Sequence, residues 1–210
     1  MYIAIEGVIG VGKTTLARLL QPSFQADLLL EVFEENPFLR SFYNDRERYA
    51  FQTQIFFLLS RYHQHRRAAT ALDSRGSLIS DYTFEKDALF ARINLHGDEL
   101  EMYYRVHQAL AEKILRPDLV IYLRADTQIL VQRIASRDRA YERQMETNYI
   151  DQLNQAYEDF FADPPPGLKV LSIDTNHLNV VSRGEDLKWI ETRIRQSLRL
   201  APFQEELPLG

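Results

Sequence analysis

Eight residues near the N-terminus have the types and spacing of a phosphate-binding loop. The run Gly7-Val8-Ile9-Gly10-Val11-Gly12-Lys13-Thr14 fits G-x-x-x-x-G-K-[ST] at every fixed position. Glycines let backbone N–H groups turn inward around phosphate oxygens, and the N-terminus of a following helix adds a partial positive charge. Lys13 can reach the β- and γ-phosphates of a nucleotide, and the Thr14 hydroxyl can bind Mg²⁺. We therefore predict that this loop, together with the adjoining Thr15, binds ATP and Mg²⁺.

Two acids, Glu31 and Asp81, directly follow predicted strands of the chain. In an open α/β sheet, ligands bind beyond the carboxyl ends of the strands. One of the two acids could accept the proton of an attacking hydroxyl while the other helps to hold Mg²⁺. The alternative is that both are ordinary surface carboxylates, or that Asp81 caps the helix that follows it.

Four arginines, Arg133, Arg137, Arg139 and Arg143, crowd a predicted helix end and the loop after it. A solvated basic face is the ordinary interpretation of such a run. The alternative is a mobile lid that brings guanidinium groups onto a transferred phosphoryl group, where an arginine can be worth ~10³–10⁵ in rate.

A pair of histidines, His63 and His65, invites a metal interpretation. Two residues apart on a helix, their side chains point about 200° away from each other, so they cannot chelate one ion. We expect both to be surface histidines.

Apolar runs and helical spacing predict the elements that position these residues. The five predicted strands are residues 2–5, 27–30, 77–80, 119–123 and 170–173. The predicted helices are residues 14–20, 49–72, 84–95, 98–115, 127–137 (with Thr127 as its N-cap), 149–161 and 186–200. Strands that alternate with helices indicate a parallel α/β sheet covered on both faces. We expect one domain over residues 1–200 and a C-terminal tail over 201–210.

Composition excludes several classes of protein. The chain has 210 residues, 45% of them apolar, and a net charge of −5, which weighs against nucleic acid as its main partner. It has no cysteine, so disulfides, thiolate metal sites and cysteine nucleophiles are excluded. No apolar run approaches the ~20 residues that span a bilayer, and no signal-peptide pattern begins the chain. We expect a cytoplasmic protein that does not bind membranes.

Taken together, the loop, the two acids and the arginines resemble the deoxynucleoside kinase family, in particular its bacterial deoxyadenosine/deoxyguanosine kinase branch. The similarity covers nearly the whole chain. After the phosphate loop, its most specific segment is Glu31-x-x-Glu34-Glu35-Asn36-Pro37-Phe38, which is similar to the family's E-P-V-E-E-N-P-Y. The resemblance implies a P-loop kinase fold with a five-stranded parallel sheet, helices on both faces and an arginine-rich lid. It also implies that Glu31 is the general base for a 5′-hydroxyl.

The same resemblance implies how a nucleoside is bound. Tyr43 falls in the segment whose tyrosine binds the sugar 3′-hydroxyl, and Glu142 matches a lid glutamate with the same role. Gln54 and Arg61 fall where the family places base-binding residues on a long helix, and Asp87 falls where it places their acidic partner. Family members are generally homodimers, so a homodimer is expected.

Two further matches concern the phosphates. Arg137 and Arg139 correspond to the lid arginines that bind them, and Asp81 begins the segment after the third strand. That segment departs from the family, whose usual D-R-S or E-R-S is here Asp81-Tyr82-Thr83. The missing arginine normally supports the 5′ end of the nucleoside and the phosphates. The family's stacking aromatic is also displaced, because Ala91 stands at its position and Phe90 is the nearest ring.

The predicted activity is the ATP-dependent phosphorylation of a deoxynucleoside 5′-hydroxyl in nucleotide salvage. Deoxyadenosine is expected to be preferred, with deoxyguanosine and deoxycytidine behind it and thymidine poorest, because thymine would turn a carbonyl oxygen toward Asp87. Two alternatives stay open from the sequence: a nucleoside monophosphate kinase similar to thymidylate kinase, and a P-loop module that binds ATP without turnover.

Overall fold

A computed structural model describes residues 1–143 and 145–202 of the protein, with side chains 70, 71 and 73–75 left out of the description. Residues 203–210 of the expected tail therefore lie outside the described residues.

One parallel sheet of five strands forms the centre of the molecule, in the order β2-β3-β1-β4-β5. The strands are β1 (Tyr2–Glu6), β2 (Asp27–Leu29), β3 (Leu78–Ser80), β4 (Leu119–Arg124) and β5 (Val170–Asp174). Every residue of β1 is buried, as are the first five of β4, which is typical of strands covered on both faces. The predicted five-stranded parallel α/β sheet is confirmed.

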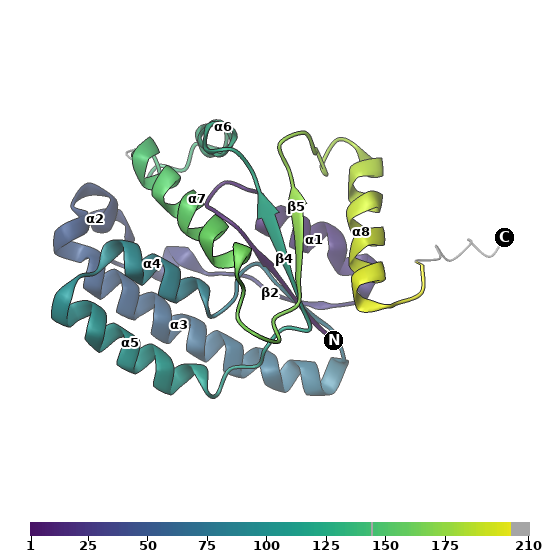
Figure 1. Cartoon of the computed structure of the whole chain (residues 1–210), viewed down its shortest axis with the longest axis horizontal. Coiled ribbons are helices and arrows are strands. Elements are labelled where there is room, and N and C mark those ends of the chain that lie inside the picture. The colour runs from purple at the N-terminus through teal and green to yellow at the C-terminus, as the bar shows by residue number, and fades with distance from the viewer. Residues whose placement is uncertain (144, 203–210) are drawn as a thin grey trace.

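Helices cover both faces of this sheet (Figure 1). They are α1 (Lys13–Phe24), α2 (Leu39–Asn44), α3 (Arg46–Arg75), α4 (Lys86–Asn94), α5 (Gly97–Ala111), α6 (Thr127–Arg137), α7 (Thr147–Ala162) and α8 (Gly184–Leu198). Figure 1 shows α1 and α8 on one side of the sheet and α3, α4, α5 and α7 on the other. The two sides together bury a core that includes Ile3 and Ile5 of β1 and Leu16 of α1.

Some element boundaries differ from the sequence prediction for local reasons. The long helix α3 begins three residues early, at Arg46, because the carboxylate of Asp45 accepts a hydrogen bond from the Arg48 N–H and caps the helix. The N-cap of α6 is Asp126 rather than Thr127, so that prediction was wrong by one residue. The Thr127 hydroxyl instead donates to Asp151 of α7 at 2.7 Å.

The expectation of two surface histidines was half wrong. His63 is exposed, whereas His65 is only 3% exposed and packs against the rings of Tyr2, Tyr82 and Phe84. A neutral imidazole is apolar enough to share such an aromatic cage. Its spacing of four residues from Arg61, which is also buried, continues the inner face of α3 and was the signal available in the sequence.

This buried histidine makes the fold sensitive to mild acid. Burial, with a smaller contribution from the charge of Arg61, lowers the pKa of His65 to about 4. A histidine in the unfolded chain titrates near pH 6.5, so between pH 6.5 and 4 the unfolded chain binds a proton that the folded chain does not. Stability should therefore fall as pH decreases through this window, by up to about 3 kcal/mol from this group, and His65 should add no further loss below it.

His65→Gln cannot be protonated, and we expect it to flatten the slope of the unfolding free energy against pH between 6.5 and 4. Urea unfolding at a series of pH values measures that slope. The exposed His63→Gln is the matched control and should keep the wild-type slope. An unchanged slope in His65→Gln would show that His65 does not carry the effect.

Candidate active site

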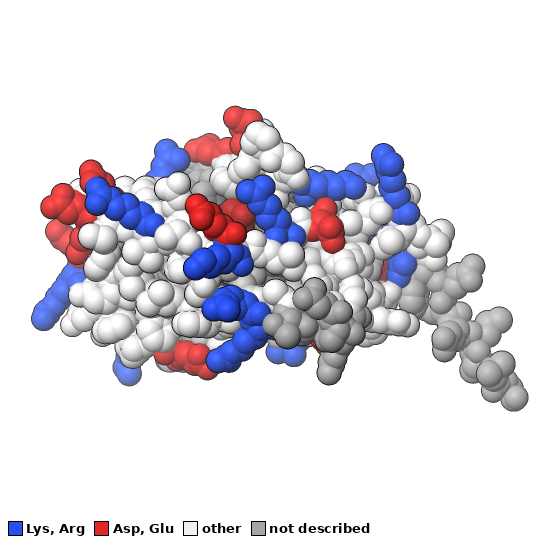
Figure 2. Space-filling model, turned by 90° about the horizontal axis from the view of Figure 1, so that it is seen from below, with Lys and Arg blue, Asp and Glu red and all other residues white. Residues whose placement is uncertain are grey.

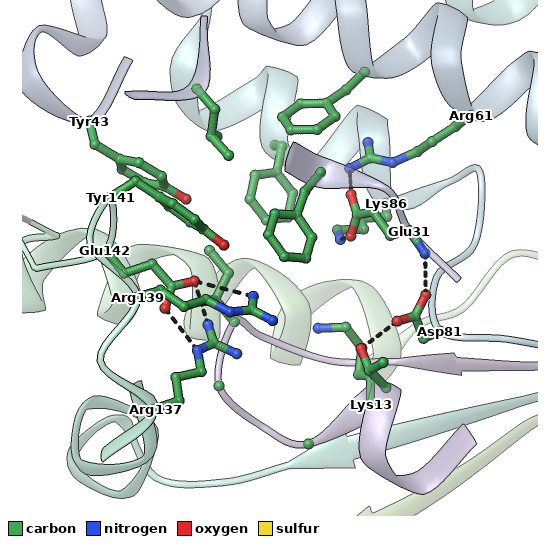
Figure 3. Close-up of a pocket in the computed structure, with 18 of the residues that line it drawn as sticks. Lys13, Glu31, Tyr43, Arg61, Asp81, Lys86, Arg137, Arg139, Tyr141 and Glu142 are labelled. Atoms are coloured by element: carbon green, nitrogen blue, oxygen red, sulfur yellow. Dashed lines mark hydrogen bonds and ion pairs between the residues drawn. The ribbon is translucent and has the colours of Figure 1, made fainter. Parts of the chain in front are cut away.

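A pocket opens at the carboxyl ends of the strands and gathers residues from every part of the predicted site (Figure 3). The phosphate loop and Asp81 form one end, α3 and α4 form a wall, and the segment after α6 covers it. The wall residues are Gln54, Phe57, Arg61, Lys86 and Phe90. The pocket thus contains the sequence-predicted ring Phe90, while Ala91 is buried elsewhere in the core.

The phosphate loop is packed so closely that only glycine fits at two positions. A Cβ on Gly7 would lie 2.4 Å from the Leu123 carbonyl oxygen, and one on Gly10 would lie 2.7 Å from Ile134 Cγ1. Both glycines also have φ values, +143° and +90°, that favour glycine. The loop leads into α1, which has no acidic residue in its first turn and no side-chain cap. Its N-terminal N–H groups therefore suit an anionic ligand.

Lys13 lies over this loop and donates to the carbonyl oxygens of Gly7 at 2.6 Å and Val8 at 3.1 Å. Burial, reinforced by the nearby charge of Lys86, lowers the pKa of Lys13 to about 8. A phosphate at the loop would give this ammonium an anionic partner, which is a stronger one than the two carbonyls.

Asp81 joins the phosphate loop to the acid that follows β2. One of its oxygens accepts the Thr14 hydroxyl at 2.5 Å, and the other accepts the backbone N–H of Glu31 at 2.8 Å. A carboxylate and a hydroxyl are the hard oxygen donors that Mg²⁺ prefers, so this pair fits the ion. Among the described residues no group of three or more His, Asp or Glu forms a metal site, so Mg²⁺ would take its other ligands from phosphate and water.

Glu31 is held by two cations. Arg61 of α3 pairs with one carboxylate oxygen, and the Lys86 ammonium donates to the other at 2.6 Å. Burial alone would raise the pKa of Glu31, but the charges and hydrogen bonds of Arg61 and Lys86 outweigh it and hold that pKa well below its usual range. Sequence reasoning identified Glu31 and Arg61 but missed Lys86.

The predicted base-binding residues divide into two kinds. Gln54 is 2% exposed and lines the pocket, and its side-chain oxygen has no hydrogen-bond partner among the described residues. Asp87 is fully buried and does not line the pocket, because it lies behind Arg61 and pairs with it. Asp87 therefore presents its carboxylate to Arg61 and not to the pocket, so a thymine in the pocket would not meet it directly, contrary to the prediction from the sequence.

The segment after α6 brings two of the four clustered arginines into the pocket. Arg137 makes a two-pronged ion pair with Glu142, at 2.8 and 2.6 Å, and Arg139 approaches the same carboxylate at 3.8 Å. Tyr141 of this segment stacks on Tyr43 with ring centroids 6.2 Å apart. We call residues 137–142 the lid segment. It carries Arg137, Arg139 and Glu142, all three of which line the pocket.

The other two arginines of the cluster lie outside the pocket. Arg133 donates to the carbonyl and hydroxyl oxygens of Thr175, at 2.6 and 3.0 Å. Arg143 is exposed and pairs with Asp138. The ordinary interpretation of a charge run, a solvated face, therefore applies to Arg143 alone. Arg133 is half-buried and also donates to the Val11 carbonyl oxygen at 3.4 Å, so it ties the loop after β5 to the phosphate loop.

Glu6 is a further buried acid that sequence reasoning missed. It is 1% exposed and accepts hydrogen bonds from the Gly7 N–H, from the N–H and hydroxyl of Thr83, and from the Tyr157 hydroxyl. Burial raises its pKa. Glu6 thus ties the phosphate loop to the segment after β3. The available signal was an acid at the end of an otherwise apolar strand.

Known proteins resemble this chain in sequence and in structure. It is 34% identical over 199 residues to a deoxyguanosine kinase from Bacillus subtilis (strain 168), an alignment that covers 93% of this chain and 96% of that protein. A deoxyadenosine/deoxycytidine kinase of the same organism is 31% identical, with 84% of this chain and 85% of that protein covered. The solved structure of deoxyadenosine kinase from M. mycoides with bound dATP superposes with a TM-score of 0.80 and 26% identity, over 93% of this chain and 100% of that one.

A family model for deoxynucleoside kinases matches residues 3–199, nearly the whole chain. The pocket agrees with that match, because the phosphate loop, Glu31, Asp81 and the lid arginines all line it. The chain therefore belongs to the deoxynucleoside kinase family, as its sequence predicted.

Proposed function

We propose that this protein transfers the γ-phosphoryl group of ATP to the 5′-hydroxyl of a purine deoxynucleoside, a reaction of nucleotide salvage. The observation that carries the proposal is a series of contacts through one pocket, from Thr14 to Asp81, then to Glu31, then to Arg61 of α3. The phosphate loop stands at one end of this series, and α3 presents the amide of Gln54 seven residues before Arg61. A donor and an acceptor bound at these ends would meet at Glu31.

Each residue then has a chemical task. Glu31 accepts the proton of the 5′-hydroxyl, and Lys13, Arg137 and Arg139 stabilise the negative charge of the phosphoryl group in transit. Tyr43 and Glu142 hold the 3′-hydroxyl. Thr14 and Asp81 would hold Mg²⁺, which would neutralise charge at the phosphates.

The negative charge of Glu31 itself favours a nucleoside over a nucleoside monophosphate as the acceptor. A monophosphate carries about two negative charges, which the Glu31 carboxylate would repel, whereas a hydroxyl carries none. A module that binds ATP without turnover would need neither this acid nor the lid arginines. Both alternatives therefore have less support than a deoxynucleoside kinase.

We also propose a cytoplasmic homodimer. The side of the molecule that carries α3 and α5 exposes Leu59, Met102 and Tyr104, and Figure 2 shows a broad uncharged area there. Light scattering on the purified protein measures the mass in solution and tests the dimer. No helix in the described part of the chain is both long and apolar enough to cross a membrane.

The function is tested by measuring kcat/KM for the four deoxynucleosides at fixed ATP and Mg²⁺. We expect deoxyadenosine and deoxyguanosine to be used best and thymidine worst, because the free amide oxygen of Gln54 can accept from an exocyclic amine that thymine lacks. Deoxynucleoside monophosphates are the control acceptors and should release no ADP. Thymidine as the best substrate would overturn the base preference, and ADP release with monophosphates alone would overturn the acceptor class.

Glu31→Gln should lower kcat by ~10²–10⁴-fold while changing KM for the deoxynucleoside much less, because a general base acts in the transition state. Lys13→Ala should abolish turnover. The exposed Glu34→Gln, three residues along the same segment, is the matched control and should keep wild-type rates. A Glu31→Gln enzyme with near-normal kcat would remove Glu31 from the mechanism.

Replacing both Arg137 and Arg139 with Ala should cost at least ~10²-fold in kcat, by analogy with other arginines that contact a transferred phosphoryl group. The lid segment should become more ordered when a phosphate-bearing ligand binds, as amide hydrogen exchange would detect. Arg143→Ala, on the exposed arginine just beyond the lid segment, is the control and should leave kcat unchanged. A loss of only a few-fold in the double variant would return the two arginines to a surface role.

A further inference from the structure

Lys86 is a buried lysine at the reaction centre. It is the first residue of α4, it is 6% exposed, and it lines the pocket. In the described part of the chain its ammonium has one hydrogen-bond partner, the Glu31 carboxylate at 2.6 Å. An ammonium has three N–H donors, so two are left for a ligand. The face of the Phe90 ring, with its centroid 5.4 Å from the ammonium, borders the same space.

The position of this lysine is costly for the fold. A cation in the first turn of a helix has the unfavourable sign with respect to the helix dipole. Burying an ammonium is costly unless it is paired. Glu31 and Asp87 share the single cation of Arg61, so Lys86 balances the second carboxylate charge. Its remaining N–H donors have no protein partner among the described residues, and an anion in the pocket would give them one.

The arginine that the family pattern would place in this region is absent, and its replacement cannot serve. Tyr82 is fully buried and does not line the pocket. Its hydroxyl donates away from Glu31, to the side-chain oxygen of Gln64 at 2.6 Å. In the segment between Asp81 and the first residue of α4, Lys86 is the one cationic side chain that reaches the pocket.

In its present position, Lys86 weakens Glu31 as a proton acceptor. A carboxylate with a cation at each oxygen is a weak proton acceptor, because both cations favour its charged form. Arg61 is anchored by Asp87 on its far side, whereas Lys86 has a flexible stem and a single partner. Lys86 is therefore the cation that can leave. Across the pocket it faces the Lys13 ammonium, and the charge of each disfavours the other until an anion lies between them.

We propose that Lys86 is a catalytic residue that moves from Glu31 to the transferred phosphoryl group and binds it together with Lys13. The proposal rests on the kinase function proposed above. In the step, the 5′-oxygen forms a bond to the γ-phosphorus, and the bond from that phosphorus to the β–γ bridging oxygen breaks. The electron pair of the broken bond remains on ADP, and the 5′-hydroxyl proton passes to the Glu31 oxygen that Lys86 has left.

The first test compares Lys86→Met, which removes the charge at similar length, with Lys86→Arg. Lys86→Met should lower kcat by at least ~10²-fold with KM for the deoxynucleoside within about threefold of wild type. Lys86→Arg should recover most of kcat because it restores the cation. Lys188→Met, an exposed lysine of α8, is the control and should behave as wild type. A kcat for Lys86→Met within a few-fold of wild type would overturn the proposal.

The second test separates contact with the phosphoryl group from a role exercised only through Glu31. If Lys86 touches the phosphoryl group, adding Lys86→Met to Glu31→Gln should lower kcat further. If it acts only through Glu31, the double variant should match Glu31→Gln.

A binding measurement keeps the inference separate from the proposed function. Calorimetry should show that Lys86→Met weakens a non-hydrolysable ATP analogue relative to ADP by about tenfold, because only the analogue carries the γ-phosphate. Its thermal unfolding midpoint, measured alongside, reports whether the variant is folded. An unchanged ratio of the two affinities would overturn the inference about Lys86. A wild-type protein with no turnover on any deoxynucleoside would instead overturn the proposed function.

Discussion

The two ends of the active site are joined by one carboxylate. Asp81 accepts the hydroxyl of Thr14 and the backbone N–H of Glu31, so it holds the start of α1 and the end of β2 against the end of β3. This is possible because β3 lies between β1 and β2 in a sheet whose strands all point the same way. The spacing between the phosphate loop and Glu31 is therefore set by three adjacent strands, which are far stiffer than the loops they support.

Around that carboxylate the pocket is a balance of buried charges. Glu31 and Asp87 share Arg61, and Lys86 supplies the second cation of Glu31. Such pairing is what makes buried carboxylates tolerable, because an uncompensated charge in the interior is strongly destabilising. The same two cations hold the pKa of Glu31 well below its usual range. The base role that we propose for Glu31 therefore requires one of these cations to move away.

In the lid segment, too, a buried carboxylate is paired with a cation. Glu142 is buried and holds Arg137 through two hydrogen bonds, so an arginine that we propose for phosphate binding already has an anionic partner inside the molecule. The stacking of Tyr141 on Tyr43 adds an apolar contact between the lid segment and α2. If the proposed roles hold, a phosphate-bearing ligand competes with Glu142 for these guanidinium groups, which links phosphate binding to the carboxylate that we propose for the sugar 3′-hydroxyl.

Local sequence was sufficient for the parallel sheet, the phosphate loop and the family. A glycine-rich turn between a buried strand and a helix depends on neighbouring residues alone, as does the apolar run of a strand. The tertiary structure decided the rest: His65 is caged by aromatic rings, Asp87 lies behind Arg61, and Lys86 reaches Glu31 from another element. Spacing along a helix gives the direction of a side chain. The residue that this side chain contacts can lie far away in the sequence, as Lys86 and Glu31 do at a separation of 55 residues. Only the packing of the folded chain determines such a contact.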